Sequence, residues 1–251
     1  MKYKAVILAA GLGSRLGNLT EEIPKALVKV DGHPIIDYQM NALICNNIDD
    51  VIIVVGYKKD ILVNYVNQNW NNKLNLHFVE NTNYATTNSA FSLNLAKEFI
   101  DSDSCIHMNC DTIFTTKSIS MLMNSKEINQ IVVNKDIQLA DNMEQVYLDD
   151  SNRITYMNNV YDKKAVGKAM GLAKISKGTL NWITERIEHY HGNELFNSNF
   201  YGIIRECIPN IPFYSLCTRM NSIVEVNSQV ELEIADKLIR SNKLAFGLEV
   251  K

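Results

Sequence analysis

The chain has 251 residues, a formal net charge of −3 and 46% hydrophobic residues, so it can bury one substantial core. This charge argues against a general nucleic-acid or membrane-surface binder, and we expect any phosphate binding to be local. No apolar run approaches the roughly 18 residues that a membrane-spanning helix needs. A predicted strand begins almost at the N-terminus and leaves no room for a signal peptide, so we expect a cytoplasmic protein.

The cysteines form no C-x-x-C pair and have no zinc-site spacing. This pattern predicts reduced, mostly buried thiols, as is usual in the cytoplasm. The five positions are Cys45, Cys105, Cys110, Cys207 and Cys217.

The first half of the chain alternates between strand and helix patterns. Continuous or alternating apolar runs predict strands over residues 5–9, 51–55, 74–79 and 104–109. Apolar residues at helical spacing predict helices over residues 34–46, 59–70 and 88–99. Strands separated by helices of this length predict a parallel sheet with right-handed crossovers.

The pattern changes after residue 114. Strands of a mixed or antiparallel patch are predicted over residues 130–134, 144–148, 153–156 and 168–175. Helices are predicted over residues 179–190, 193–206 and 228–242, and a short strand over residues 222–226. Ser228 and Glu231 have the spacing of a capping box at the start of the last helix. We expect one domain over residues 1–251, with a core at about 1–114 and 221–251 and an inserted lobe at about 115–220.

A glycine-rich turn follows the first predicted strand. Gly11-Leu12-Gly13-Ser14-Arg15 comes directly after the apolar run, and Lys25 follows a few residues later. Such a turn lets backbone N–H groups approach phosphate oxygens. The residues of a Walker loop are absent, and so is the third glycine of a dinucleotide fingerprint, which argues against a dinucleotide-dependent oxidoreductase. The combination predicts a nucleoside triphosphate site.

Several motifs resemble those of the nucleotidyltransferases that make nucleotide sugars and CDP-activated alcohols. The segment over residues 8–16, Thr20 and Pro24-Lys25-Ala26-Leu27 are similar to the family signature. Further similarity lies over residues 32–36, 54–57, 110–111 and 225–227, and residues 83–93 look most like the phosphocholine cytidylyltransferase branch. The resemblance covers most of the chain. It implies an α/β fold: a Rossmann-like, mostly parallel three-layer sandwich with a small mixed α+β acceptor lobe.

The resemblance also implies an activity. It is a Mg²⁺-dependent transfer from CTP to a small phosphorylated compound, with release of pyrophosphate. The acceptor would be a phosphocholine-like alcohol phosphate, a phosphonate or a phospho-amino acid, and the product would decorate cell-surface polysaccharide or lipid. One alternative is a sugar-1-phosphate nucleotidyltransferase that uses UTP, dTTP or GTP, and another is an inactive nucleotide-binding regulatory module. A homodimer is possible within this family.

Site residues follow from the same resemblance. Arg15 is expected to bind the leaving pyrophosphate, Lys25 to reach the α-phosphate, and Asp111 to hold Mg²⁺. Asn227 is either a second, uncharged Mg²⁺ ligand or a turn-forming residue before a helix. The remaining predicted nucleotide-binding residues are Leu8, Ala9, Ala10, Gly11, Gly13, Ser14, Glu80, Asn88 and Ser89. A simple N-cap is the rival interpretation for Asn88 and Ser89.

The sequence indicates less clearly which residues would bind the acceptor. Phe200 and Tyr201 lie where the phosphocholine enzymes have an aromatic pair, but Gly202 replaces the acidic residue that follows, which puts choline in doubt. Both aromatic residues could equally belong to the core. Lys135 and Glu225 complete the predicted acceptor-binding set. His107 lies within a predicted buried strand, and we expect it to be a hydrogen-bonded core residue.

Overall fold

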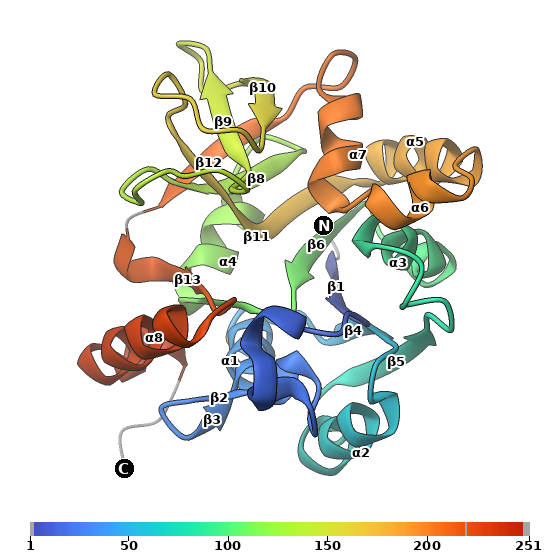
Figure 1. The fold of residues 1–251 in the computed structure, drawn as a ribbon, viewed down its shortest axis with the longest axis vertical. Helices are drawn as coiled ribbons and strands as arrows, with labels where there is room; N and C mark the ends of the chain where they lie inside the picture. Colours follow the sequence, from blue (N-terminus) through green and yellow to red (C-terminus); the bar gives the residue numbers. More distant parts are fainter. Residues whose placement is uncertain (1–2, 219, 248–251) are drawn as a thin grey trace.

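The computed structural model describes residues 3–218 and 220–247. Within these residues the main sheet has nine strands in the order β10-β9-β11-β6-β1-β4-β5, with β8 paired to β11 and β12 paired to β8 (Figure 1). The strands are β1 (Tyr3–Ala9), β4 (Asp50–Val55), β5 (Asn75–Glu80), β6 (Ser104–Asn109), β8 (Gln130–Asn134), β9 (Gln145–Leu148), β10 (Ile154–Asn158), β11 (Gly167–Ser176) and β12 (Tyr214–Thr218). Two small ribbons pair β2 (Lys29–Val30) with β3 (His33–Pro34), and β7 (Thr112–Phe114) with β13 (Ile223–Glu225).

The parallel part of the sheet is built around β1. This strand pairs in parallel with β4 on one side and with β6 on the other, and all of its residues are buried. Its continuous apolar sequence suits a strand that is covered on both faces. The carboxyl ends of β1, β4 and β6 meet at one edge of the sheet, which is where ligands bind in open α/β sheets.

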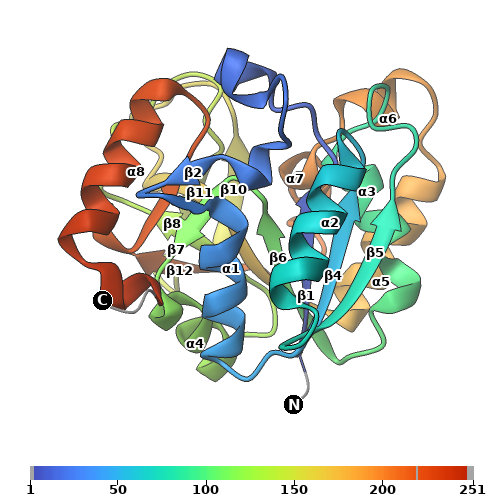
Figure 2. The same cartoon turned by 90° about the horizontal axis from the view of Figure 1, so that it is seen from below.

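Helices cover both faces of the sheet (Figure 2). One face packs against α1 (Ile35–Ile44), α2 (Lys59–Trp70) and α4 (Thr116–Asn124). The other packs against α3 (Ser89–Leu95), α5 (Lys177–Glu188) and α7 (Phe200–Cys207), with α6 (Asn193–Asn197) just before α7. A third cluster joins α8 (Gln229–Ser241) to β2 and to the side of α1. The predicted three-layer α/β fold is therefore confirmed.

The middle strands continue the central sheet. β11 pairs antiparallel with β6, with Leu172 opposite Met108, and on its other side it carries β8 and β9. The mixed or antiparallel patch predicted for this region is thus confirmed: β8, β9, β10 and β11 pair antiparallel, and β12 joins β8 in parallel. The prediction omitted α4, β2, β3, β7 and β12. The limits of the acceptor lobe stay a prediction.

Two predicted helices are shorter than expected. The helix predicted over residues 193–206 is interrupted, because Ser198 and Asn199 have extended backbones and Asn199 caps α7 by accepting the Gly202 N–H at 2.7 Å. The helix predicted over residues 88–99 ends at Leu95 and is followed by a 3₁₀ turn. The Asn199 side-chain cap explains the first break, where apolar spacing alone suggested continuity.

The burial of the cysteine side chains differs in part from the prediction. All five are free thiols, and Cys105 and Cys207 are buried, but Cys45 and Cys217 are exposed. The prediction that the thiols are mostly buried is therefore wrong for these two. In the part of the chain that the structure describes, no helix is both long and apolar enough to cross a membrane.

Candidate active site

The glycine-rich turn forms a compact loop after β1. Gly13 has a left-handed backbone (φ 69°) and begins the 3₁₀ segment Ser14–Thr20. The Thr20 hydroxyl closes the loop by donating to the Gly13 carbonyl at 3.1 Å. A Cβ atom at Gly13 would lie 3.2 Å from the Cβ of Lys25, so glycine allows the loop and this lysine to approach each other closely.

Two cations, a carboxylate and an amide meet beside this loop. The Lys25 ammonium donates to Asp111 Oδ2 at 2.6 Å and to Asn227 Oδ1 at 2.9 Å. The Arg15 guanidinium donates to the same Asn227 oxygen at 2.6 Å. The side chains of Lys25 and Asp111 are 8% and 17% exposed, so this ion pair is largely shielded from water. The structure thus brings together all three predicted catalytic residues and the predicted second metal ligand.

The backbone explains why Asp111 and Asn227 lie close together. Asp111 follows β6 and Asn227 follows β13, and the Val226 N–H donates to the Asp111 carbonyl at 2.8 Å. The predicted capping box is confirmed, because Ser228 accepts the Glu231 N–H and Glu231 accepts the Asn227 N–H at 2.8 Å. The start of α8 therefore holds the Asn227 amide against Lys25 and Arg15. Asn227 is the turn residue that was expected, and its role as a metal ligand stays a prediction.

Asp111 is held in its ionised form. Burial acts to raise the pKa of this carboxyl group, but the adjacent Lys25 ammonium outweighs burial and holds the pKa below its usual value. An ionised carboxylate and an amide oxygen at neighbouring strand ends are oxygen donors of the kind that Mg²⁺ prefers. Among the described residues no group of three or more His, Cys, Asp or Glu side chains could hold a metal by itself.

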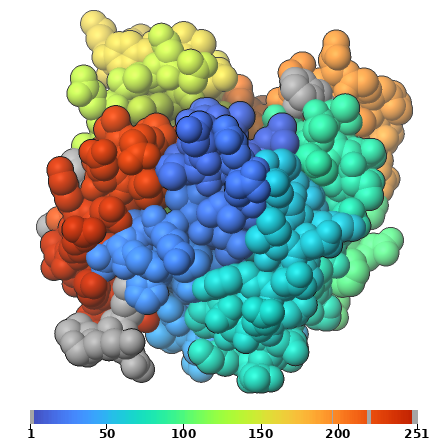
Figure 3. All heavy atoms as spheres, turned by 60° about the horizontal axis from the view of Figure 1, so that its bottom comes forward, coloured from blue at the N-terminus to red at the C-terminus, as the bar shows by residue number. Residues whose placement is uncertain are grey.

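A cavity of about 520 Å³ opens over this cluster. Figure 3 shows the molecule hollowed between the yellow-green middle segment and the orange segment, beside the blue N-terminal segment. The predicted residues that line the cavity are Leu8, Ala10, Gly11, Gly13, Ser14, Arg15, Lys25, Asn88, Ser89, Asp111, Phe200 and Tyr201. Residues outside the predicted site set also line it, several of them within the motifs noted in the sequence, namely Leu12, Asn81, Tyr84, Ala85, Thr87, Ser92, Asn109, Cys110 and Asn199.

Other predicted residues do not line this cavity. Ala9 is buried within β1, and Glu80 pairs with Lys59 at 2.6 Å on the surface. Lys135 is exposed and lines a separate cavity. Glu225 also lines a different cavity, although its carboxylate lies 3.4 Å from the Asn227 amide nitrogen. The structure therefore places Glu80 and Lys135 away from the cavity that the glycine-rich loop and Asp111 line.

Glu225 has a partner that the sequence did not reveal. The Lys168 ammonium donates to Glu225 Oε2 at 2.5 Å, and the Gly171 N–H donates to Oε1 at 3.0 Å. Both side chains of the ion pair are only 10% exposed. Burial acts to lower the pKa of Lys168, but the Glu225 carboxylate outweighs it, so the net pKa is raised and the lysine is charged. Lys168 thus neutralises the carboxylate that was predicted to bind the acceptor.

The segment before α3 caps this helix and also lies at the cavity. The Asn88 side chain accepts the Ser89 N–H and caps α3, yet both residues also line the cavity. Ser89 Oγ accepts the Phe200 N–H at 2.8 Å and so ties α3 to α7. Asn81 was missed, although a polar residue directly after a strand is a recognisable signal. It is buried and donates to the hydroxyls of Thr87 and Ser92.

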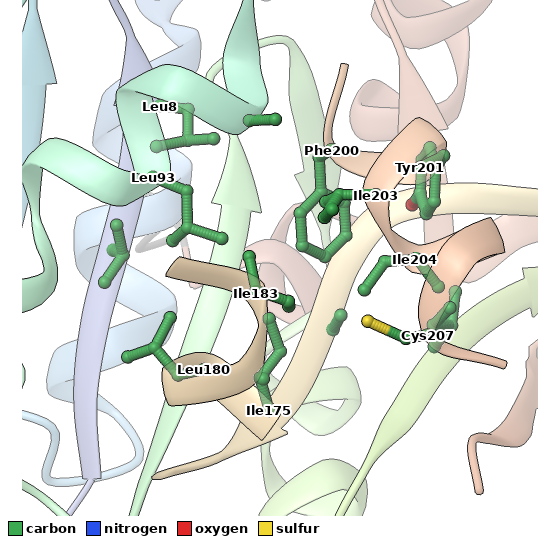
Figure 4. Close-up of a cluster of buried hydrophobic side chains, with 14 of the residues drawn as sticks. Leu8, Leu93, Ile175, Leu180, Ile183, Phe200, Tyr201, Ile203, Ile204 and Cys207 are labelled. Carbon is green, nitrogen blue, oxygen red and sulfur yellow. The ribbon is translucent and has the colours of Figure 1, made fainter. Parts of the chain in front are cut away.

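The aromatic pair belongs to the core as well as to the cavity wall. Figure 4 shows Phe200 and Tyr201 side by side on the first turn of α7, next to apolar side chains. The Phe200 ring stacks on His107 with the ring centroids 3.6 Å apart, and the Tyr201 hydroxyl donates to the Met170 carbonyl. His107 is fully buried, but neither ring nitrogen has a hydrogen-bond partner among the described residues. The expectation of a hydrogen-bonded histidine is therefore wrong.

Comparisons with known proteins agree with this geometry. The family model described as "Nucleotidyl transferase" matches residues 4–154. The CTP:phosphoglutamine cytidylyltransferase of Campylobacter jejuni is 36% identical over 137 residues, which is 52% of each chain. The choline-phosphate cytidylyltransferase of Streptococcus pneumoniae is 29% identical over 95% of this chain and 99% of the relative. The chain thus spans about half of the first relative and nearly all of the second.

Solved structures extend the agreement to the whole fold. A structure of the CTP:phosphocholine cytidylyltransferase from Streptococcus pneumoniae has a TM-score of 0.76 at 28% identity and covers 95% of this chain and 100% of its own. The inositol-1-phosphate CTP transferase from T. maritima has a TM-score of 0.77 at 19% identity, covers 94% and 96% of the two chains, and shows the fold alone. The family match spans more than half of the sequence and includes Arg15, Lys25 and Asp111. The chain therefore belongs to the nucleotidyl transferase family.

Proposed function

We propose that this protein transfers a cytidylyl group from CTP to a small phosphorylated compound, with Mg²⁺ as the cofactor and pyrophosphate as the second product. The observation that carries the proposal is the convergence of Arg15, Lys25 and Asp111 on one cavity behind a glycine-rich loop. The relatives named above act on phosphoglutamine and on phosphocholine according to their names, and a further relative is named a 2-aminoethylphosphonate cytidylyltransferase. These names support CTP and a small acceptor that carries a phosphate or phosphonate.

In this proposal the protein mainly positions the substrates and balances charge. An oxygen of the acceptor phosphate attacks the α-phosphorus of CTP, and the bond to the bridging oxygen of pyrophosphate breaks. The loop over residues 11–14 would present backbone N–H groups to the β- and γ-phosphates. Lys25 would stabilise the charge that develops on the α-phosphate, and Arg15 would bind the leaving pyrophosphate through its planar fork.

The oxygen donors of the site fit Mg²⁺. Asp111 and Asn227 would hold the ion together with substrate phosphates, because Mg²⁺ usually keeps few protein ligands. When bound, Mg²⁺ would neutralise charge on the triphosphate. Lys25 donates to oxygens of Asp111 and Asn227, and Arg15 donates to the Asn227 oxygen. The triphosphate and Mg²⁺ would compete for these groups, because phosphate oxygens attract both cations.

A screen of substrate pairs tests the reaction. Pyrophosphate release would be measured for each of the common nucleoside triphosphates with a panel of phosphorylated alcohols, phosphonates, phospho-amino acids and sugar 1-phosphates. We expect release with CTP and a small non-sugar acceptor. Release only with UTP, dTTP or GTP and a sugar 1-phosphate would support the sugar nucleotidyltransferase alternative. No release from any pair would favour a regulatory module.

Two substitutions that keep the approximate shape of the side chain test the proposed roles of Lys25 and Asp111. Lys25→Gln and Asp111→Asn are each expected to lower kcat/KM by about 100-fold or more. Each substitution removes a charged side chain of the protein that would act on the reacting phosphates. Lys59→Gln is a matched control, since this lysine pairs with Glu80 on the surface and does not line the cavity. The melting temperature of each variant separates lost chemistry from lost folding. Normal turnover in Lys25→Gln or Asp111→Asn would contradict the proposed mechanism.

A further inference from the structure

The two ends of the Asn227 side-chain amide face opposite charges. Its oxygen accepts hydrogen bonds from Arg15 at 2.6 Å and from Lys25 at 2.9 Å, whereas its nitrogen donates to Glu225 Oε2 at 3.4 Å. A half turn of the amide would place its N–H groups against two cations and its oxygen against a carboxylate. The charges on the two sides therefore favour a single orientation of this amide.

The Glu225 carboxylate is itself held by two donors from β11. The Gly171 N–H donates to its Oε1 at 3.0 Å, and the Lys168 ammonium donates to its Oε2 at 2.5 Å. A Cβ atom at Gly171 would lie 2.4 Å from the Thr112 hydroxyl oxygen, so glycine lets β11 approach β7 closely. Thr112 in β7 pairs with Glu225 in β13, and this approach brings the Gly171 N–H within reach of the carboxylate. Both carboxylate oxygens are therefore fixed by donors.

The Lys168–Glu225 ion pair lies behind the residues that face the cavity over the glycine-rich loop. Arg15 and Lys25 line this cavity, whereas Glu225 and Lys168 line a second cavity of about 570 Å³ between β11 and α8. A triphosphate in the first cavity would meet the two cations directly. The ion pair can act on such a ligand only through Asn227, which joins Glu225 to both cations.

On the basis of the proposed function, we infer that Glu225 and Lys168 are positioning residues for Asn227. They keep its amide oxygen turned towards the two cations of the cavity, Arg15 and Lys25. These like charges repel each other, and the oxygen that they share offsets part of the repulsion. An amide that could turn would direct its N–H groups at both cations and displace them from the triphosphate site. This role differs from the acceptor contact that the sequence led us to expect for Glu225.

Glu225→Gln tests the effect of this carboxylate on nucleotide binding. The variant keeps the shape of the side chain, but the Asn227 nitrogen loses its charged partner. We expect the dissociation constant of CTP, measured by calorimetry, to rise about tenfold, the loss typical of one hydrogen bond to a charged group. The KM of the acceptor found in the substrate screen should stay unchanged. A raised KM for the acceptor with unchanged CTP binding would overturn the inference.

A second substitution separates orientation of the amide from general support of the fold. Asn227→Asp introduces a carboxylate, whose two oxygens are equivalent, so no orientation has to be maintained. It also places a second negative charge beside Glu225. In this background we expect Glu225→Gln to leave the affinity for CTP unchanged or to improve it, because the glutamine amide can donate to the carboxylate at position 227. The same loss of affinity in both backgrounds would show that Glu225 only supports the fold, and would overturn the inference.

Lys168→Gln tests the other member of the ion pair, and it can be measured even if Glu225→Gln does not fold. It removes the cation that fixes Glu225, so we expect the dissociation constant of CTP to rise several-fold. Lys174→Gln is the matched control, because this buried lysine lies at the other end of β11 and donates to the Ser125 carbonyl at 3.0 Å. Both variants should have a lower melting temperature, but only Lys168→Gln should bind CTP more weakly. Equal CTP affinities in the two variants would overturn the role of Lys168.

The outcomes separate the inference from the proposed function. If the wild type binds CTP and releases pyrophosphate, and Glu225→Gln binds CTP equally well, the inference fails and the cytidylyltransferase proposal stands. If the wild type binds no nucleoside triphosphate and releases no pyrophosphate with any acceptor, the proposed function fails and the inference fails with it.

Discussion

His107 is a fully buried side chain that lies directly beneath the cavity wall. Its ring supports Phe200, and neither of its nitrogens is hydrogen-bonded within the described residues. Burial lowers the pKa of His107 to about 3, so the imidazole is neutral in the folded protein at physiological pH. In the unfolded chain the same group titrates near its ordinary value of about 6.5.

This difference predicts a loss of stability in mild acid. Below about pH 6.5 the unfolded chain binds a proton at His107 that the native protein excludes, so the free energy of unfolding falls as the pH is lowered towards 3. At pH 5 the loss from this group is about 2 kcal/mol. This loss of unfolding free energy can be measured by urea unfolding of the wild type and of His107→Leu from pH 7.5 to 4.5. The variant should lose less stability over this range, and parallel curves would contradict the assignment.

At the scale of elements, the turn between β1 and the Lys25 segment sets the geometry of the site. The turn depends on the left-handed backbone of Gly13 and on the narrow gap between this residue and Thr20 and Lys25. An alanine here must adopt a left-handed conformation and press against both neighbours. The loop would then move relative to Lys25. A substitution at this glycine should therefore change both the stability of the fold and the position of the lysine.

Gly13→Ala is therefore expected to impair both stability and activity. The backbone alone should cost about 1–2 kcal/mol of unfolding free energy, and kcat/KM should fall further than this loss of stability explains. Gly178→Ala in α5 is the control, because a Cβ atom there meets nothing within 4 Å and alanine favours a helix. Denaturant unfolding and pyrophosphate release measure the two effects. A Gly13→Ala enzyme with unchanged activity would show that the loop does not need this shape.

At the scale of the whole molecule, the site joins segments that are far apart in the sequence. Arg15 and Lys25 come from the N-terminal part, Asp111 from the middle and Asn227 from the beginning of α8. A ligand that engages the glycine-rich loop together with the Asp111 and Asn227 oxygens would bind only the folded chain. Binding of this kind stabilises the folded state by mass action.

CTP with Mg²⁺ should therefore raise the melting temperature. At 100 times the dissociation constant the gain is about 2.7 kcal/mol, which corresponds to roughly 5–10 °C for a chain of this size. Thermal scans would compare CTP with Mg²⁺, CTP with EDTA, and Mg²⁺ alone. Asp111→Asn should lose most of the shift that depends on Mg²⁺. A shift of equal size with EDTA would argue against a metal at Asp111.

The parts of the fold that follow from neighbouring residues could be predicted. The apolar run of β1, the glycine-rich turn and the capping box of α8 depend on residues adjacent in the sequence, and all three are present in the structure. The position of Asp111 after a buried strand followed from the same local pattern. Local apolar spacing also suggested one helix over residues 193–206, which the cap at Asn199 divides.

The pairing of distant polar residues was decided only by the tertiary structure. Arg15 with Asn227, Lys168 with Glu225, and Glu144 with Arg205 lie far apart in the sequence and share no local pattern. The sequence by itself determined the strand, the turn and the charged residues of the phosphate loop, because hydrophobic periodicity and turn preferences act between neighbours. Chain folding decided which charges meet, because these contacts depend on how remote segments pack.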